Sequence, residues 1–286
     1  MNRNRLGSSA VEVTAIGLGT AQLGNLYDDL DDATATSIVT AAWNAGVRYF
    51  DTAPHYGLGL AEQRLGIALA PHVRADYVVS TKVGRLIVDG ARHWDFSASG
   101  VLRSIEESLA RLRMDRIDIA LIHDPQGHLG EALDLAYPAL ARLRAEGVVG
   151  AIGAGTGDLA ALAAFAKHTD IDALMIAGRL TLLEAPALTE VVPACAEAGI
   201  SILNAGIFNT GLLATAHPGA DSRYEYATVP PALLARAQHL ADLAEREGST
   251  LQQAALKFAG SDGTVASVVV GADSPEQIAS TVRLAS

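Results

Sequence analysis

Cysteine is nearly absent from this chain of 286 residues, and basic side chains are few. Because Cys195 is the only cysteine, no disulfide can form within the chain, and the apolar sequence around it favours a buried packing role over a nucleophile. Lys and Arg total 21 against 32 Asp and Glu, which gives a formal net charge of −11. We therefore expect no nucleic-acid partner, since phosphate backbones are held by clustered Lys and Arg.

Long hydrophobic runs are also missing, although half of the residues are hydrophobic. Gly, Asp or Arg interrupts each apolar stretch well short of the ~18 residues that a membrane span needs, so no membrane association is expected. The first residues, MNRNRLGSSAVEV, contain arginines but no apolar core, which predicts no secretory signal and a cytoplasmic location. No HxH or HExxH pattern occurs among the eight histidines, so we expect no metal. The sequence does not indicate an oligomeric state.

Helical patterns alternate with short apolar runs along the whole chain. Such alternation is typical of parallel βαβ units. Gly46, Gly147 and Gly199 follow helical patterns, where a left-handed residue ends a helix, and Ser97 stands where an N-cap is expected. The expected strands cover residues 14–19, 47–51, 77–82, 117–123, 148–155, 171–178, 200–206 and 265–271. Eight such units without a linker predict one α/β domain over residues 1–286, a closed (β/α)8 TIM barrel.

An open doubly wound sheet is the main alternative to the barrel. Gly153, Gly155 and Gly157 follow an expected strand and open a helix, as a phosphate-binding turn would. The dinucleotide fingerprint, however, needs a further glycine where Asp158 stands, and the segment lies in the middle of the chain. We therefore prefer the barrel.

Three expected strands end in an ionisable residue: Asp51, Lys82 and His123. Each has an ordinary structural explanation when taken alone, but the carboxyl ends of barrel strands build one active site, and Tyr56 follows closely after Asp51. A phenol with an ordinary pKa of ~10 becomes a useful acid or base when a nearby cation stabilises its phenolate. The four residues could therefore form a proton relay that needs a hydride partner.

The segments around these residues resemble the aldo-keto reductase superfamily over nearly the whole chain. The similarity is carried by FDTAPHYG, STKVG, LIHDP and the opening GLGTAQLGN. The longer segments YFDTAPHYGLGLAEQRLG, WDFSASGV and IFNTGLL resemble its sugar-dehydrogenase branch. The resemblance implies a TIM barrel whose bottom is capped by an N-terminal β-hairpin, and NAD or NADP as cofactor.

The resemblance also implies roles for the residues. Tyr56 is expected to act as general acid/base, with its pKa lowered by Lys82 and Asp51, while His123 orients the substrate oxygen. The reaction implied is the oxidation at C1 of an aldose such as L-fucose, D-arabinose or L-galactose to a lactone. The residues expected at the cofactor are Thr20, Asp51, Thr156, Gly206, Phe208, Asn209, Gly211, Leu212, Gly271, Ala272, Asp273, Ser274 and Gln277. Those expected at the substrate are Tyr27, His55 and Trp94.

Several positions depart from the pattern of the superfamily. Asp273 replaces a basic residue that meets the adenosine 2′-phosphate, which favours NAD over NADP. The residues that hold the nicotinamide are changed at Thr156 and Gly157 and at Leu180, and the adenine pair is Ser280-Thr281. The chain also stops at Ser286, before a substrate-covering tail, so a more open pocket is expected. Two alternatives remain: a reductase of small aldehydes or ketones, including pyridoxal, and a cofactor-binding regulatory barrel.

Overall fold

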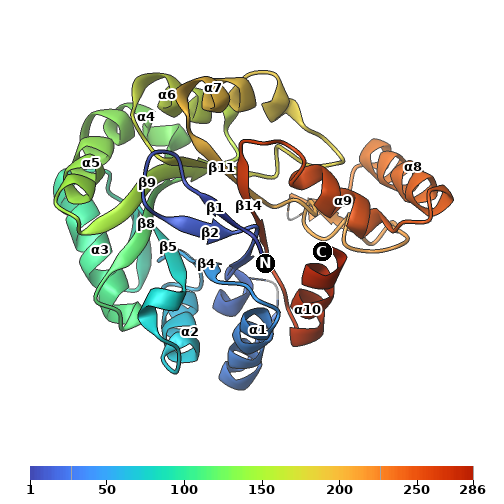
Figure 1. Cartoon of the computed structure of the whole chain (residues 1–286), viewed down its shortest axis with the longest axis horizontal. Helices are drawn as coiled ribbons and strands as arrows, with labels where there is room; N and C mark the ends of the chain where they lie inside the picture. The colour runs from blue at the N-terminus through green and yellow to red at the C-terminus, as the bar shows by residue number, and fades with distance from the viewer. Residues whose placement is uncertain (27, 226, 286) are drawn as a thin grey trace.

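The computed structural model, which describes every residue except 27, 226 and 286, contains a closed barrel of parallel strands (Figure 1). The strands follow one another around the barrel in the order β10-β11-β14-β3-β4-β5-β8-β9. Their bounds are β3 Ile16–Gly19, β4 Tyr49–Asp51, β5 Val78–Val83, β8 Ile117–His123, β9 Val149–Thr156, β10 Ala173–Ala177, β11 Ser201–Ala205 and β14 Val265–Val270. Each expected strand is present, so the predicted TIM barrel is confirmed.

Helices surround the barrel and cover the outer faces of its strands (Figure 1). The helices are α1 Asp32–Asn44, α2 Leu60–Leu69, α3 Ala98–Leu112, α4 Leu129–Glu131, α5 Tyr137–Ala145, α6 Leu159–His168, α7 Val191–Ala198, α8 Pro231–Arg246, α9 Leu251–Ala259 and α10 Pro275–Leu284. A π-helical segment, Ala132–Ala136, joins α4 to α5. Within the described part of the chain, every helix is too short or too polar to cross a membrane.

The predicted helix boundaries are confirmed at several caps. The hydroxyl of Ser97 accepts a hydrogen bond from the backbone N–H of Gly100, as an N-cap does. Gly46, Gly147 and Gly199 have φ angles of 92°, 75° and 68°, in the left-handed region that ends a helix without strain in glycine.

A hairpin of β1 (Arg3–Arg5) and β2 (Glu12–Thr14) closes one end of the barrel, crossing its centre in Figure 1. Leu6 and Val13 of this segment are fully buried in the cluster that fills the barrel interior. The backbone N–H of Gly7 donates to the hydroxyl of Ser201, the first residue of β11 (2.9 Å). The hairpin therefore covers the amino-terminal ends of the strands, and the expected N-terminal cap is confirmed.

The open-sheet alternative is wrong, because β3 pairs with β14 and closes the barrel. Gly153 lies inside β9, where a Cβ atom would stand 2.0 Å from the carbonyl oxygen of Ala173 on the neighbouring strand. Asp158 is the N-cap of α6 and accepts from the N–H of Ala161 (2.8 Å). This glycine-rich segment thus serves close strand packing and helix capping.

Two hairpins and one helix were not anticipated from the sequence. The hairpin of β6 (Arg85–Val88) and β7 (Ala91–Trp94) follows β5, and that of β12 (Arg223–Tyr224) and β13 (Ala227–Thr228) follows β11. Both lie in loops after strand carboxyl ends, so they add side chains to the open end of the barrel. Helix α9 follows α8 directly.

Cys195 lies on α7 and is fully buried among apolar side chains. Burial, with a smaller contribution from Asp262, raises the pKa of its thiol to about 12. A thiol of this kind is a poor nucleophile, as the sequence analysis expected.

Candidate active site

Asp51, Lys82 and His123 meet at the open end of the barrel because each ends or nearly ends its strand. Asp51 closes β4, Lys82 is the penultimate residue of β5 and His123 closes β8. The ammonium group of Lys82 lies 2.7 and 2.9 Å from the two carboxylate oxygens of Asp51 and also donates to the carbonyl oxygen of Thr52 (2.9 Å). Both charged side chains are almost fully buried. The ion pair is thus fixed by three hydrogen bonds.

Tyr56 lies above this pair and beside His123. The ammonium nitrogen of Lys82 is 4.9 Å from the centroid of the Tyr56 ring, and the rings of Tyr56 and His123 meet edge to face at 6.0 Å. The structure therefore brings all four predicted catalytic residues together. We call Asp51, Tyr56, Lys82 and His123 the tetrad.

The pKa values of the tetrad differ in part from the expectation. Burial raises the pKa of Tyr56, the Lys82 cation lowers it, and the Asp51 carboxylate raises it again, so the pKa lies above its ordinary value. Lys82 acts on the phenol as expected, but the expectation that Asp51 lowers this pKa is wrong, because a nearby negative charge opposes a phenolate. Asp51 acts instead by keeping Lys82 charged: burial lowers the pKa of Lys82, but the carboxylate outweighs burial and the net pKa is raised.

His123 is a neutral imidazole in this environment. Burial lowers its pKa well below the ordinary value of 6.5, and the cations Lys82 and Arg85 lower it further. Its Nδ1 atom has no hydrogen-bond partner among the described residues. A neutral histidine can donate one hydrogen bond to a substrate oxygen without giving up its proton.

Behind Asp51, two hydroxyl groups extend the network into the barrel. The hydroxyl of Ser80 donates to Oδ1 of Asp51 (2.6 Å) and shares a second hydrogen bond with the hydroxyl of Tyr49 (3.0 Å). Both side chains are fully buried. The carboxylate is therefore held on one side by a cation and on the other by a hydroxyl, which fixes its orientation.

A second set of side chains stands next to the tetrad, and we call His55, Arg85, Trp94 and Asp124 the mouth cluster. Arg85 donates from Nη1 to the carboxylate of Asp124 (2.5 Å) and lies 2.7 Å from Nε2 of His55. Its guanidinium carbon is 4.5 Å from the centroid of the Trp94 ring. His55 and Trp94 were predicted as substrate residues; Arg85 and Asp124 were missed. Tyr27, the third predicted substrate residue, lies outside the described residues.

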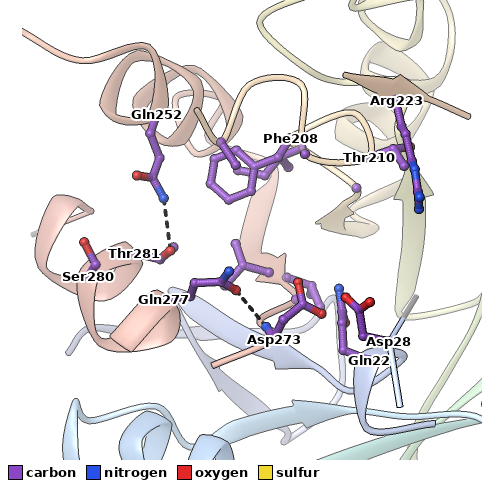
Figure 2. Close-up of a pocket in the computed structure, with 17 residues that line it drawn as sticks. Gln22, Asp28, Phe208, Thr210, Arg223, Gln252, Asp273, Gln277, Ser280 and Thr281 are labelled. Carbon is purple, nitrogen blue, oxygen red and sulfur yellow. Dashed lines mark hydrogen bonds between the residues drawn. The ribbon is translucent and has the colours of Figure 1, made fainter. Parts of the chain in front are cut away.

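A cavity of about 580 Å³ lies at the open end of the barrel, between the loop after β11 and the loop after β14 (Figure 2). Six of the predicted cofactor residues line it: Gly206, Phe208, Gly211, Gly271, Asp273 and Gln277. Ser280 and Thr281, which the sequence placed at the adenine, also line it. Nine further lining residues were not assigned to the cofactor from the sequence: Gln22, Asp28, Ile207, Thr210, Ala214, Arg223, Gln252, Val269 and Val270. These nine residues come from loops, from β14 and from α9, and these segments meet at the cavity only in the folded chain.

The other predicted cofactor residues do not line the cavity. Leu212 and Ala272 are buried in apolar clusters, and Ser274 is the N-cap of α10. Thr20 is fully buried and donates through its hydroxyl to the backbone oxygen of Asp51 (3.0 Å), so these two lie together at the tetrad.

Thr156, the last residue of β9, is buried, and its hydroxyl donates to Oε1 of Gln126 (2.8 Å). Leu180 is also buried, within an apolar cluster.

The loop that follows β11 has unused polar groups suited to a phosphate-bearing ligand. Asn209, Thr210 and Gly211 have consecutive positive φ angles of 47°, 60° and 92°. Among the described residues, the backbone N–H groups of Thr210 and Gly211 have no hydrogen-bond partner, and the buried Oδ1 of Asn209 is also unpartnered. Successive backbone donors in such a turn form an anion-binding concavity, and Arg223 adds a cation to the cavity wall. This region fits the pyrophosphate of the expected dinucleotide.

The opposite side of the cavity carries two carboxylates. Figure 2 shows Asp273 and Asp28 side by side, near Gln22. Burial raises the pKa of Asp273, and the negative charge of Asp28 raises it further, which places the two groups within electrostatic reach of each other. The backbone N–H of Asp273 donates to Oε1 of Gln277 (2.7 Å), so the residue is fixed at the start of α10. This side of the cavity is acidic.

Known proteins that resemble this chain share both its sequence pattern and its fold. The sequence pattern of the Aldo/keto reductase family matches residues 15–286. D-threo-aldose 1-dehydrogenase of a Pseudomonas species is 44% identical, covering 95% of this chain and 89% of the relative. Pyridoxal 4-dehydrogenase of Microbacterium luteolum is 32% identical, with 96% and 90% covered. L-galactose dehydrogenase of Arabidopsis thaliana is 30% identical, with 96% and 84% covered.

Solved structures share the fold of this chain. The holo form of an aldo-keto reductase from Bacillus halodurans superimposes with a TM-score of 0.81 at 25% identity, covering 99% of this chain and 90% of that one. A glycerol dehydrogenase from Gluconobacter oxydans, with a TM-score of 0.79 at 24% identity over 99% and 89% of the two chains, shares the fold.

Proposed function

Because this chain belongs to the aldo/keto reductase family, whose members use NAD(P)(H), we propose that it is a dehydrogenase that oxidises an aldose at C1 to a lactone. The observation that carries the proposal is the tetrad: a phenol, a buried ion pair and a neutral imidazole meet at one point of the barrel mouth. Similarity to D-threo-aldose and L-galactose dehydrogenases supports a sugar as the substrate.

In the proposed reaction, Tyr56 takes the proton from the anomeric hydroxyl of the sugar. Lys82 stabilises the phenolate that accepts this proton, since its charge already lowers the pKa of Tyr56 against burial. Asp51 holds Lys82 in place and keeps it charged. The neutral His123 donates a hydrogen bond to the same sugar oxygen and orients it. The loop after β11 and the start of α10 would hold the nicotinamide cofactor, which would supply the hydride acceptor.

The test is a spectrophotometric assay with L-fucose, D-arabinose and L-galactose, supplied with NAD⁺ or NADP⁺. The wild-type protein is expected to reduce the cofactor, and Tyr56→Phe to lower kcat about 10²- to 10⁴-fold, the usual contribution of a general acid/base. Tyr137→Phe, a change on α5 away from the tetrad, is the matched control and should keep full activity. Full activity in Tyr56→Phe would contradict the role of Tyr56 as general acid/base. Absence of cofactor reduction with every sugar would contradict the aldose proposal.

Pyridoxal oxidation is a second candidate function, favoured by the 32% identity to a pyridoxal 4-dehydrogenase. Trp94 at the mouth is 42% exposed, and its apolar indole suits contact with an aromatic substrate as well as with a sugar. Pyridoxal therefore belongs in the same assay, and a kcat/KM above that of every sugar would favour this function.

NAD is proposed as the preferred cofactor because Asp273 and Asp28 make one side of the cavity acidic. A carboxylate accepts hydrogen bonds from ribose hydroxyls but repels the 2′-phosphate of NADP. In fluorescence titrations, Asp273→Arg should shift the ratio of the two dissociation constants toward NADP⁺ by about tenfold or more, the scale of one charge-assisted hydrogen bond. Glu245→Arg makes the same charge change on the exposed face of α8 and should leave the ratio unchanged. Equal wild-type affinity for NAD⁺ and NADP⁺ would contradict the proposal.

A further inference from the structure

The mouth cluster is a connected polar network beside the tetrad. Its members come from three different loops: His55 follows β4, Arg85 and Trp94 belong to the β6–β7 hairpin, and Asp124 follows β8. Arg85 joins them, with Asp124 at 2.5 Å, His55 at 2.7 Å and the Trp94 ring at 4.5 Å. None of these contacts fixes the Lys82–Asp51 pair.

The cluster touches the tetrad at His123. The carboxylate of Asp124 lies 3.5 Å from Nε2 of His123, and the rings of His55 and His123 meet edge to face at 5.9 Å. A substrate whose oxygen is bound by His123 would therefore bring the group on its next carbon against Asp124 and Arg85. The side chains of Arg85 and Asp124 remain 18% and 29% exposed, so a ligand can reach them.

Asp124 holds an unusual backbone conformation. Its φ of 45° lies in the left-handed region, which is costly for residues other than glycine, although Asp and Asn tolerate it best. Its N–H donates to the carbonyl oxygen of Gly155 on β9 (2.9 Å), which keeps the residue in this conformation. Strain of this kind gathers at ligand sites, and here it turns the carboxylate toward Arg85.

The hydrogen-bonding roles in the cluster follow from its chemistry. A guanidinium can only donate, so Nε2 of His55 is the acceptor and the ring proton resides on Nδ1. Burial and the charges of Arg85 and Arg92 lower the pKa of His55 to about 4, so the ring is neutral at physiological pH. The cluster therefore offers a carboxylate acceptor, guanidinium and imidazole donors, and the apolar indole of Trp94, a residue that is 42% exposed.

We propose that the mouth cluster is the specificity-determining element of this enzyme and selects neutral substrates that carry hydroxyl groups on the carbons next to the reacting carbon. Hydroxyl groups both donate and accept, which matches the paired carboxylate and guanidinium, and the CH face of a polyol suits the indole ring. An anionic substrate is disfavoured because Asp124 already neutralises Arg85 and would repel a second carboxylate. The inference rests on the proposed oxidoreductase function and names the groups that choose its substrate.

The experiment compares two aldehydes that differ only in two hydroxyl groups, glyceraldehyde and propanal, in the reductive direction with NADH and NADPH supplied separately. The wild-type kcat/KM should be higher for glyceraldehyde. Asp124→Asn, which suits the left-handed backbone, and Arg85→Gln should each lower kcat/KM for glyceraldehyde about 10- to 100-fold, mainly through KM, and that for propanal by less than about twofold. Arg142→Gln removes an exposed charge from α5, outside the network, and should change neither value.

The possible failures can be told apart. If the variants lose activity equally with both aldehydes, or the wild-type protein prefers the anionic aldehyde glyoxylate, the cluster does not select hydroxyl groups and the inference is overturned, while the role of the tetrad stands. If glyceraldehyde is preferred through Arg85 and Asp124 but no aldose is oxidised, the aldose proposal fails and the inference holds. Absence of turnover with both aldehydes overturns the inference together with the assigned activity.

Discussion

Lys82 and Asp51 depend on each other, because both charges lie where water hardly reaches. Burying a charge costs several kcal/mol, and only the opposite charge and nearby hydrogen bonds compensate for it. The first prediction is that Lys82→Met lowers the free energy of unfolding by about 3–5 kcal/mol, since the carboxylate of Asp51 then stays buried without its cation. Urea denaturation followed by circular dichroism measures this loss.

A double variant provides the control for this prediction. Lys82→Met combined with Asp51→Asn removes both charges, so its loss of stability should be clearly smaller than the sum of the two single losses. Losses that simply add would show that the ion pair contributes nothing as a pair.

The tetrad could be predicted from sequence because three of its members end strands, and strand ends of a barrel meet at one face. The shift of the Tyr56 pKa could not be predicted from sequence, because its direction depends on how strongly burial opposes the charge of Lys82. Only the distances in the folded protein define that balance. Arg85 and Asp124 were missed for a similar reason: a charged residue in a loop has no periodic pattern, and their pairing joins segments far apart in the chain.

At the scale of elements, helix α2 lies unusually close to the end of helix α3. A Cβ atom on Gly66, in the middle of α2, would stand 2.2 Å from the carbonyl oxygen of Leu112, the last residue of α3. The second prediction is that Gly66→Ala destabilises the protein by about 1–3 kcal/mol, since the overlap outweighs the ~1 kcal/mol that alanine gains in helix propensity. Thermal or urea denaturation tests it.

Gly130 on α4 is the matched control, because a Cβ atom there would meet nothing within 4 Å. Gly130→Ala should be neutral or slightly stabilising. If Gly66→Ala were as stable as the wild-type protein, α2 and α3 would have to separate without cost.

Helix ends and barrel strands were predictable because local chemistry determines them: Ser97 caps α3 through its own side chain, and apolar runs form buried strands. The β6–β7 hairpin was not predictable from sequence, since all four residues of β7 are exposed. Its sequence, ARHW, also lacks an alternation of apolar and polar residues. The pairing between its two strands, rather than the intrinsic β-propensity of their residues, determines such a hairpin.

At the scale of the whole molecule, the half-buried His55 and the buried His123 make stability depend on pH. The pKa of His55 is about 4, and burial places that of His123 well below 6.5. Between these values and pH 6.5, the unfolded chain binds protons that the folded protein excludes. The third prediction is that the free energy of unfolding decreases as the pH falls from 6.5 toward 4 and gains nothing more from these groups above 6.5.

The variant His55→Gln isolates one of the two contributions, because glutamine keeps an acceptor for Arg85 but does not titrate. Urea midpoints measured from pH 7 down to pH 5 should fall less steeply in the variant than in the wild-type protein. Parallel curves would show that His55 is accessible enough to be protonated in the folded state.

The closed arrangement of the strands was predictable because eight similar units in one chain leave few other folds. The cavity on the open end was only partly predictable. Glycines and polar residues in the loops after β11 and β14 indicated its position, but Asp28, Arg223 and Gln252 reach it from segments whose course follows from tertiary packing.

The pairing of β3 with β14 also has a consequence for how the protein is made. Ile16 pairs with Val268 and Leu18 with Val270, so the seam of the barrel joins the beginning of the chain to its end. During synthesis on the ribosome, one edge of β3 stays unpaired until β14 has emerged. A nascent chain that stalls before residue 265 therefore exposes this edge to other chains, and the emergence and pairing of β14 is the step that removes the hazard.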